Sequence, residues 1–285
     1  LWHNSALRRF DTGTSTIGST AILGAPAASP NFWYFDAARI DPANPNALFV
    51  SFSTYAPAYS KLQRFTRTGA DSVTAGVALD YVGYTAVNST ATAAEDIAIY
   101  RMRFFPNTGA VPLALRGKLL VIGADTAPGL GLGAVRLWLA DTTTLALTQI
   151  ATVQATGGSG PMAIGDNGDV FCVIPPPNFN PDGVSVVRFT AGALANAVTT
   201  NTPLAPTAAT TVIAATENLP NINALVAVNE GGNQVLIYSQ RDTGTLVRRS
   251  VTTGGFAVFA QGAGPVGPNY WGGAGSVDLQ DGDFT

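Results

Sequence analysis

Charged residues are scarce in this sequence. Asp, Glu, Lys and Arg make up 12% of the 285 residues, and 15 bases stand against 18 acids for a formal net charge of −3. The bases are scattered along the chain rather than gathered in a stripe that could neutralise a run of phosphates, which argues against nucleic acid as a partner. Apolar residues reach 46%, so the chain has the material for a packed core.

Cysteine, histidine and long apolar runs are equally scarce. The single cysteine excludes an intrachain disulfide, and Cys172 stands in the apolar run 170–174, where we expect a buried and inert thiol. Any catalytic triad or zinc site with a histidine would have to use His3, the only one. No segment approaches about 18 consecutive apolar residues, so we predict no membrane-spanning helix.

Helical patterns are also missing, and strand patterns take their place. No segment keeps apolar residues at i, i+3, i+4 and i+7 over ten positions without β-branched or Gly-rich breaks. The 31 Gly, 18 Pro and 32 Thr favour short strands joined by tight turns. Continuous apolar runs predict strands buried on both faces at 47–50, 119–122, 170–174 and 224–228. The predicted fold class is all-β.

A loose repeat refines this prediction to a β-propeller of about six four-stranded blades. A strand that carries Arg, Tyr or Trp beside apolar residues runs six times into a turn with Thr, Asp or Gly, and 285/6 gives about 48 residues per unit, a typical blade length. The six copies lie at 7–13, 62–69, 99–109, 135–142, 184–192 and 235–244. A β-sandwich or an irregular β-solenoid is the alternative.

The two ends of the chain suggest how such a ring closes. Residues 2–13 have the pattern of the later half of a blade, and residues 273–285 that of an earlier half. One blade built from both ends would hide strand edges that otherwise invite aggregation. We therefore expect residues 1–285 to form a single propeller domain, closed by pairing of its N- and C-terminal segments.

One segment carries a family resemblance. Residues 225–246 contain the strand LVAV, the turn NEGGN, the strand QVLIY and the turn DTG. This order resembles one repeat of the lactonase-like and surface-layer-type β-propellers. The resemblance implies a propeller fold, and the family includes both sugar-lactone hydrolases and non-catalytic cell-surface proteins, so it leaves catalysis open.

Two groups of acidic residues are candidate metal sites. Asp278, Asp281 and Asp283 offer closely spaced oxygen ligands of the kind that Ca²⁺ binds, although they do not fit the usual loop pattern in register. The run 166–169, Asp-Asn-Gly-Asp, is a smaller candidate. An ordinary hairpin turn is the competing interpretation of both. No other cofactor is expected. Asn88 begins a glycosylation sequon, Asn-Ser-Thr.

These observations favour a non-catalytic extracellular propeller, exposed on a cell or virion surface, with a structural or binding role. Self-association into a filament or sheath, or contact with other surface proteins, would suit its low charge. One alternative is a lactonase-like hydrolase that uses carboxylates and a divalent cation, with Asp41, Asp166 and Asn223 as candidate site residues. The other is a carbohydrate-binding propeller that stacks sugars on exposed tryptophans. Its candidates are Trp33, Trp138 and Trp271.

Overall fold

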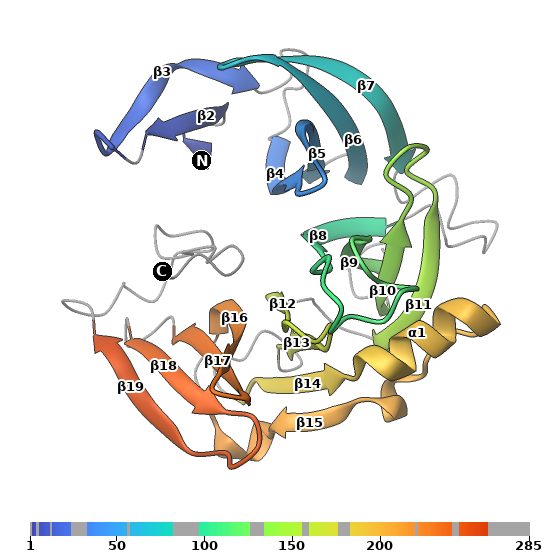
Figure 1. The fold of residues 1–285 in the computed structure, drawn as a ribbon, viewed down its shortest axis with the longest axis vertical. Helices are drawn as coiled ribbons and strands as arrows, with labels where there is room; N and C mark the ends of the chain where they lie inside the picture. Colours follow the sequence, from blue (N-terminus) through green and yellow to red (C-terminus); the bar gives the residue numbers. More distant parts are fainter. Residues whose placement is uncertain are drawn as a thin grey trace. The chain divides into compact units, whose positions relative to one another are not determined.

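Nearly all regular structure in this protein is β-strand (Figure 1). The computed structural model describes residues 2–3, 6–11, 13–23, 33–55, 58–81, 97–125, 134–155, 160–175, 183–219, 222–240 and 245–261. Within these ranges the chain forms one three-stranded and four four-stranded antiparallel sheets. The order of strands in each sheet follows the chain, as repeated hairpins dictate. The predicted all-β class is confirmed.

The five sheets divide the strands as follows. The first contains β1 (Trp2–His3), β2 (Ala6–Asp11) and β3 (Thr16–Leu23). The second contains β4 (Trp33–Asp41), β5 (Asn44–Tyr55), β6 (Ala58–Gly69) and β7 (Ser72–Tyr81). The third contains β8 (Ile97–Phe104), β9 (Leu119–Asp125), β10 (Val135–Ala140) and β11 (Leu147–Gln154). The fourth contains β12 (Met162–Ile164), β13 (Val170–Ile174), β14 (Ser185–Phe189) and β15 (Thr210–Ile213). The fifth contains β16 (Ile222–Glu230), β17 (Asn233–Gln240), β18 (Thr245–Ser250) and β19 (Phe256–Gln261).

The chain divides into two compact units. The first comprises residues 1–104, 117–132 and 138–148, and the second comprises 105–116, 133–137 and 149–285. In the first unit, Phe49 of β5 meets Phe104 of β8 edge to face at 5.8 Å between ring centroids. Such a pair adds roughly 0.5–1.5 kcal/mol beyond its buried area. Met102, Leu119 and Trp138 complete the centre of this cluster.

The second unit has its own core, which joins the sheet β12–β15 to the sheet β16–β19. Phe171 and Val186 from the first of these sheets share a buried cluster with Leu225, Leu236 and Tyr238 from the second. Strand pairing places Leu225 opposite Tyr238 and Tyr238 opposite Val247, so these residues lie on one face of their sheet. That face packs against the preceding sheet.

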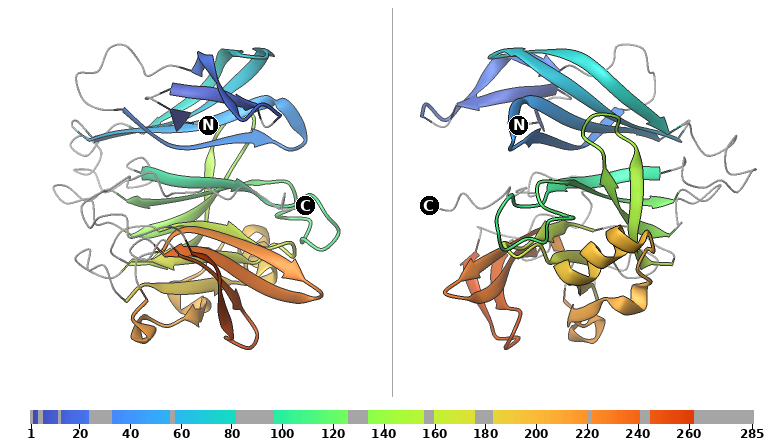
Figure 2. Two further views of the ribbon diagram at one scale, coloured as in Figure 1. Left: turned by 90° about the vertical axis from the view of Figure 1, so that its left-hand side faces the viewer. Right: turned by 45° about the vertical axis from the view of Figure 1, so that its right-hand side comes forward.

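The expectation of a chain without helix is wrong over one segment. Helix α1 spans Ala191–Thr200 and appears in yellow in both views of Figure 2. Thr190 caps it, because its side-chain oxygen accepts a hydrogen bond from the Ala193 N–H at 3.3 Å, and Asn201 ends it in the left-handed conformation. Leu194 is its one large fully buried residue. A helix that short, rich in Ala and with so little apolar periodicity, escapes pattern analysis.

The four apolar runs all form strands, but the proposed repeat is not regular. Strands β5, β9 and β13 are second in their sheets, whereas β16 is first. The six repeated segments likewise fall on first, second or third strands of different sheets. The repeat therefore marks the common chemistry of a strand followed by a turn and does not define equivalent positions.

Within the four-stranded sheets, the described connections all lie at one end. They join first strands to second strands and third strands to fourth. In an antiparallel sheet ordered along the chain, these connections lie at the same end of the sheet. Two short 3-10 helices, η4 (Pro206–Ala208) and η5 (Ala215–Glu217), flank β15 at or near its ends. No helix in the described part of the chain is both long enough and apolar enough to cross a membrane.

Candidate functional site

Several predicted site residues fall outside the part of the chain that the structure describes. These are Asp278, Asp281, Asp283, Asn88 and Trp271. Trp33 and Asn223 lie on described strands, β4 and β16, at positions where only the backbone is described. Within the described ranges, no group of three or more His, Cys, Asp or Glu side chains is arranged to hold a metal ion.

The second calcium candidate, residues 166–169, forms a tight turn between β12 and β13. Asp169 is 5% exposed, and its Oδ1 accepts a hydrogen bond from the Ala191 N–H at 2.8 Å. Its Oδ2 lies 3.6 Å from Nε of Arg188. Because protein groups engage both oxygens, this carboxylate anchors the start of helix α1 to the turn. The interpretation as a hairpin turn is confirmed here.

The same turn is joined to the next sheet. Oδ1 of Asn167 accepts hydrogen bonds from the Asp169 N–H and from Nε2 of Gln234 on β17, both at 3.1 Å. Gly165 makes room for that contact, since a Cβ there would lie 2.1 Å from Nε2 of Gln234. The polar residues of this turn therefore tie two sheets together.

Asp41, a candidate of the hydrolase alternative, also serves its own turn. Its Oδ1 accepts a hydrogen bond from the Ala43 N–H at 2.8 Å, the usual contact of an Asp that begins a turn. Asp166 is exposed in its turn. Neither carboxylate belongs to a metal-binding group among the described residues.

Two other sequence candidates lie in the core. Cys172 is fully buried on β13, as predicted, and burial raises the pKa of its thiol. Trp138 on β10 is 3% exposed and packs in the cluster around Phe49 and Phe104. Its indole face is therefore closed to a sugar ring.

Sequence reasoning missed an ion pair between a buried arginine of the sheet β16–β19 and a partly exposed glutamate of η5. Arg249 of β18 is 7% exposed, and its guanidinium donates to both carboxylate oxygens of Glu217, with Nη1 to Oε2 at 2.5 Å and Nη2 to Oε1 at 2.9 Å. The Arg249 hydrogen bonds hold the pKa of Glu217 below its usual value. Burial raises the pKa of the neighbouring Tyr238. Since Glu217 belongs to η5, which follows β15, the pair fastens one sheet to the next.

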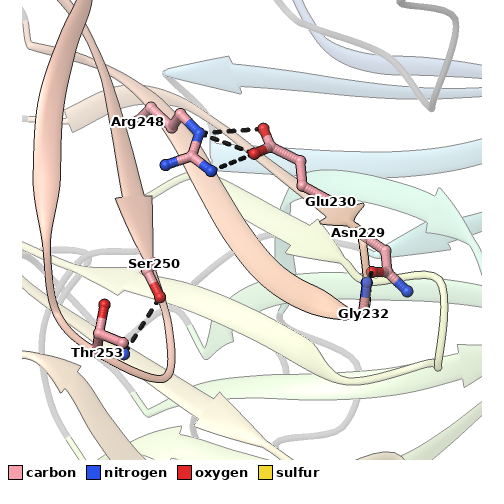
Figure 3. Close-up of polar contacts among 6 residues, drawn as sticks. All are labelled: Asn229, Glu230, Gly232, Arg248, Ser250 and Thr253. Carbon is pink, nitrogen blue, oxygen red and sulfur yellow. Dashed lines mark hydrogen bonds and ion pairs between the residues drawn. The ribbon is translucent and has the colours of Figure 1, made fainter.

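A second ion pair lies next to it in sequence but on the other face. Arg248 pairs with Glu230 at the end of β16, and both side chains are well exposed (Figure 3). The Arg248 hydrogen bonds lower the pKa of Glu230. Two turns flank the pair in Figure 3: the Gly232 N–H donates to Oδ1 of Asn229 at 2.9 Å, and the Thr253 N–H donates to Oγ of Ser250 at 3.2 Å. Successive residues of a strand point to opposite faces, so the pattern Arg-Arg in a strand was the available signal.

The outer strand of the same sheet exposes apolar side chains. On β19, Phe256 is 69% exposed and Val258 is 59% exposed. Among the described strands, β19 has a partner on one side only, β18. No charged residue occurs between Arg249 and Asp278. Outer strands normally carry charge or proline that discourages pairing, and β19 has neither, although its register with β18 shifts between Val258 and Ala260. Large exposed apolar groups on such a strand mark an interaction site.

The outer strand of another sheet is protected. On β11, the Thr152 N–H donates to the Leu204 carbonyl at 2.8 Å, and the Leu204 N–H donates to the Ile150 carbonyl at 3.0 Å. This isolated parallel bridge places residue 204 along the free edge of β11. The contrast makes the edge of β19, with Phe256 and Val258, the candidate functional surface.

Comparison with known proteins adds evidence on the fold. No family model and no curated protein matches the sequence. Among solved structures, a protein from Lactobacillus plantarum has a TM-score of 0.50 at 13% identity, with 90% of this chain and 64% of that chain covered. The major allergen Mala s 1 of Malassezia sympodialis has a TM-score of 0.48 at 10% identity, with 84% and 66% covered.

A GH43_1 enzyme from Xanthomonas citri, in complex with xylose, has a TM-score of 0.43 at 14% identity, with 85% of this chain and 77% of that chain covered. This chain spans less than two thirds of the length of the Lactobacillus and Malassezia proteins. Propeller-type folds occur among the similar structures. At these identities the likeness concerns the fold alone, an all-β chain of four-stranded sheets.

Proposed function

We propose that this chain is a non-catalytic structural or binding module, built as a β-propeller and exposed outside the cell or on a virion. The observation that carries the proposal is the apolar, uncharged edge of β19, where Phe256 and Val258 are exposed. Such an edge is suited to contact with another protein. Surface contacts made from apolar and hydrogen-bonding groups also lose little to salt.

The sheet architecture supports the propeller part of the proposal. Four-stranded sheets ordered along the chain have the composition of propeller blades. The three-stranded sheet β1–β3 is one strand short of the others. In the proposed ring, residues 1–285 form one domain, and the C-terminal segment joins the N-terminal strands in one blade.

The hydrolase alternative finds no support among the described carboxylates. Asp41, Asp141 and Asp169 accept backbone hydrogen bonds within turns or at the start of α1, and Glu217 and Glu230 pair with arginines. These contacts use the carboxylates to hold the fold. Calcium at Asp278, Asp281 and Asp283 and a glycan on Asn88 remain part of the proposal as candidate features, each open to a direct mass or binding measurement.

The test is the mass and shape of the native particle. Light scattering on the chain from its source, with electron microscopy in parallel, should give particles of at least two copies. A filament or sheath would favour a structural role, and a smaller assembly a binding role. A monodisperse particle of 29.3 kDa, the mass of one chain, would contradict the proposal.

A further inference from the structure

The hairpin β18–β19 determines which backbone groups face the free edge. The Ser250 N–H donates to the Gly255 carbonyl at 2.9 Å, and the Gly254 N–H donates to the Ser250 carbonyl at 3.0 Å. Gly254 has φ +70°. Gly254 and Gly255 thus both lie opposite Ser250. This arrangement is a β-bulge of the kind that requires a glycine in the left-handed conformation.

From this bulge the pattern of hydrogen bonds alternates along the hairpin. Arg248 and Ala257 are the next hydrogen-bonded pair, because Arg249 and Phe256 lie between that pair and the bulge. The N–H and carbonyl groups of Phe256 therefore point away from β18, toward the free edge. Val258, two residues further on, has the same orientation.

We propose that β19 pairs with β19 of a second copy of this chain, antiparallel, about a two-fold axis at Ala257. This inference rests on the proposed function and names the partner of the same surface. The axis places Phe256 of each copy opposite Val258 of the other, so the interface contains two equivalent pairs. Both residues have outward backbone groups, so each pair can exchange two hydrogen bonds.

The side chains suit the same register. An aromatic residue opposite a β-branched one is a favourable cross-strand pair, and the two-fold axis creates two such pairs from one strand. Two paired copies of the strand also place no like charges against each other, since residues 250–277 contain no Asp, Glu, Lys or Arg. These features make a second copy the occupant that fits this edge, and the paired sheets would continue from β16 of one copy to β16 of the other.

The test is a disulfide cross-link at the proposed axis. In the Ala257→Cys variant, the two introduced cysteines lie directly opposite each other in a pair without hydrogen bonds. The Cα atoms of such a pair are about 4.5 Å apart, within the range that a disulfide spans. The background is clean because Cys172 is fully buried. Thr253→Cys is the matched control. It is exposed in the turn of the same hairpin, before the start of β19, so the pairing keeps its two copies beyond the range of a disulfide.

A charge in the interface provides an independent measurement. Val258→Lys places two lysines in the paired strands and should return the protein to the mass of one chain in light scattering, whereas Val77→Lys on the edge strand β7 should not. Both positions are exposed, so each variant should keep the wild-type melting temperature to within a few degrees.

In the cross-linking experiment, we expect the Ala257→Cys variant to form disulfide-linked dimers at least tenfold faster than the Thr253→Cys variant.

The possible failures separate this inference from the function on which it rests. If the wild type associates while Ala257→Cys cross-links no faster than Thr253→Cys, the β19 pairing is wrong and the structural role stands. The same holds if Val258→Lys stays associated. If the wild type has the mass of one chain, both proposals fail.

Discussion

The sheet β16–β19 packs one face against the preceding sheet and leaves its outer edge open, and each of its two faces carries an arginine with a carboxylate partner. On the packed side, Leu236 and Tyr238 are buried against the preceding sheet and Arg249 is 7% exposed beside Glu217. On the opposite face the Arg248 side chain is 39% exposed, and at the open edge Phe256, which lies opposite Arg249, is 69% exposed. The two arginines, although adjacent in sequence, therefore have different roles.

The difference follows from burial. A charge held out of water depends on its partner, and removal of that partner leaves it uncompensated. An exposed ion pair competes with water and salt and contributes little. The packed side should thus determine the stability of the second unit, while the open edge determines what it binds.

The largest effect should come from the apolar core of the packed side. Leu236→Ala removes a fully buried side chain from the cluster with Phe171 and Tyr238, and should lower the free energy of unfolding by about 3 kcal/mol. In protein dilute enough to keep the copies apart, Phe256→Ala at the open edge should change it by less than about 0.5 kcal/mol. Urea titration of each variant at low protein concentration measures this, and equal losses would remove the distinction between the packed side and the open edge.

The ion pair of the buried Arg249 should come next. Glu217→Gln keeps the shape of the side chain but leaves the Arg249 charge without its carboxylate, at a cost of about 2 kcal/mol, which is less than for fully buried pairs because Glu217 is partly exposed. Glu230→Gln, the matched change in the exposed ion pair on the opposite face, should have a much smaller effect. Chemical denaturation of the two variants side by side decides the point. A loss from Glu230→Gln as large as that from Glu217→Gln would contradict the role assigned to burial.

The polar contact between the two sheets should have a smaller effect. Gly165→Ala forces the Gln234 side chain away from Asn167 and should cost about 1 kcal/mol, the net value of one hydrogen bond. Gly109→Ala is the control, because a Cβ at that position meets open space. In a variant that already carries Gln234→Ala, Gly165→Ala should cost less. An undiminished cost would mean that the glycine serves another purpose.

The smallest effect should be a dependence on pH. Arg249 holds the pKa of Glu217 below its ordinary value of 4.5, so this carboxylate stabilises the folded state at neutral pH and ceases to do so as the pH falls through the folded-state pKa. The stability difference between wild type and Glu217→Gln should be constant above about pH 5.5 and shrink in more acidic solution. Thermal melts from pH 7 to 3 test this, and a difference that grows in acid would reverse the predicted sign.

The sequence predicts the strands well because their signal is local. The apolar runs around Phe49, Val121, Cys172 and Val226 all form strands, since continuous β-branched and apolar residues suit a strand covered on both faces. Cys172 is buried as expected. The sequence also predicts the turns at 41–46 and 165–168, because Asp, Asn, Pro and Gly favour turns through contacts within a few residues of the chain.

The helix and the candidate surface depend on contacts that a sequence does not display. Helix α1 is ten residues long, and its start is held by Asp169, 22 residues earlier. The Glu217 and Arg249 pair joins residues 32 apart. The exposure of β19 follows from its place at the end of a sheet, and nothing within the strand itself distinguishes it from β11, whose edge Leu204 covers.

The most direct test of the account is amide hydrogen exchange of the hairpin β18–β19 at two protein concentrations. Amides of β17 should be protected at both, because that strand lies inside its sheet. The amides of Phe256 and Val258 should exchange rapidly in dilute protein and slowly in concentrated protein, since a second copy binds them. Equal exchange at both concentrations would contradict the assignment of this edge as the surface where two copies meet.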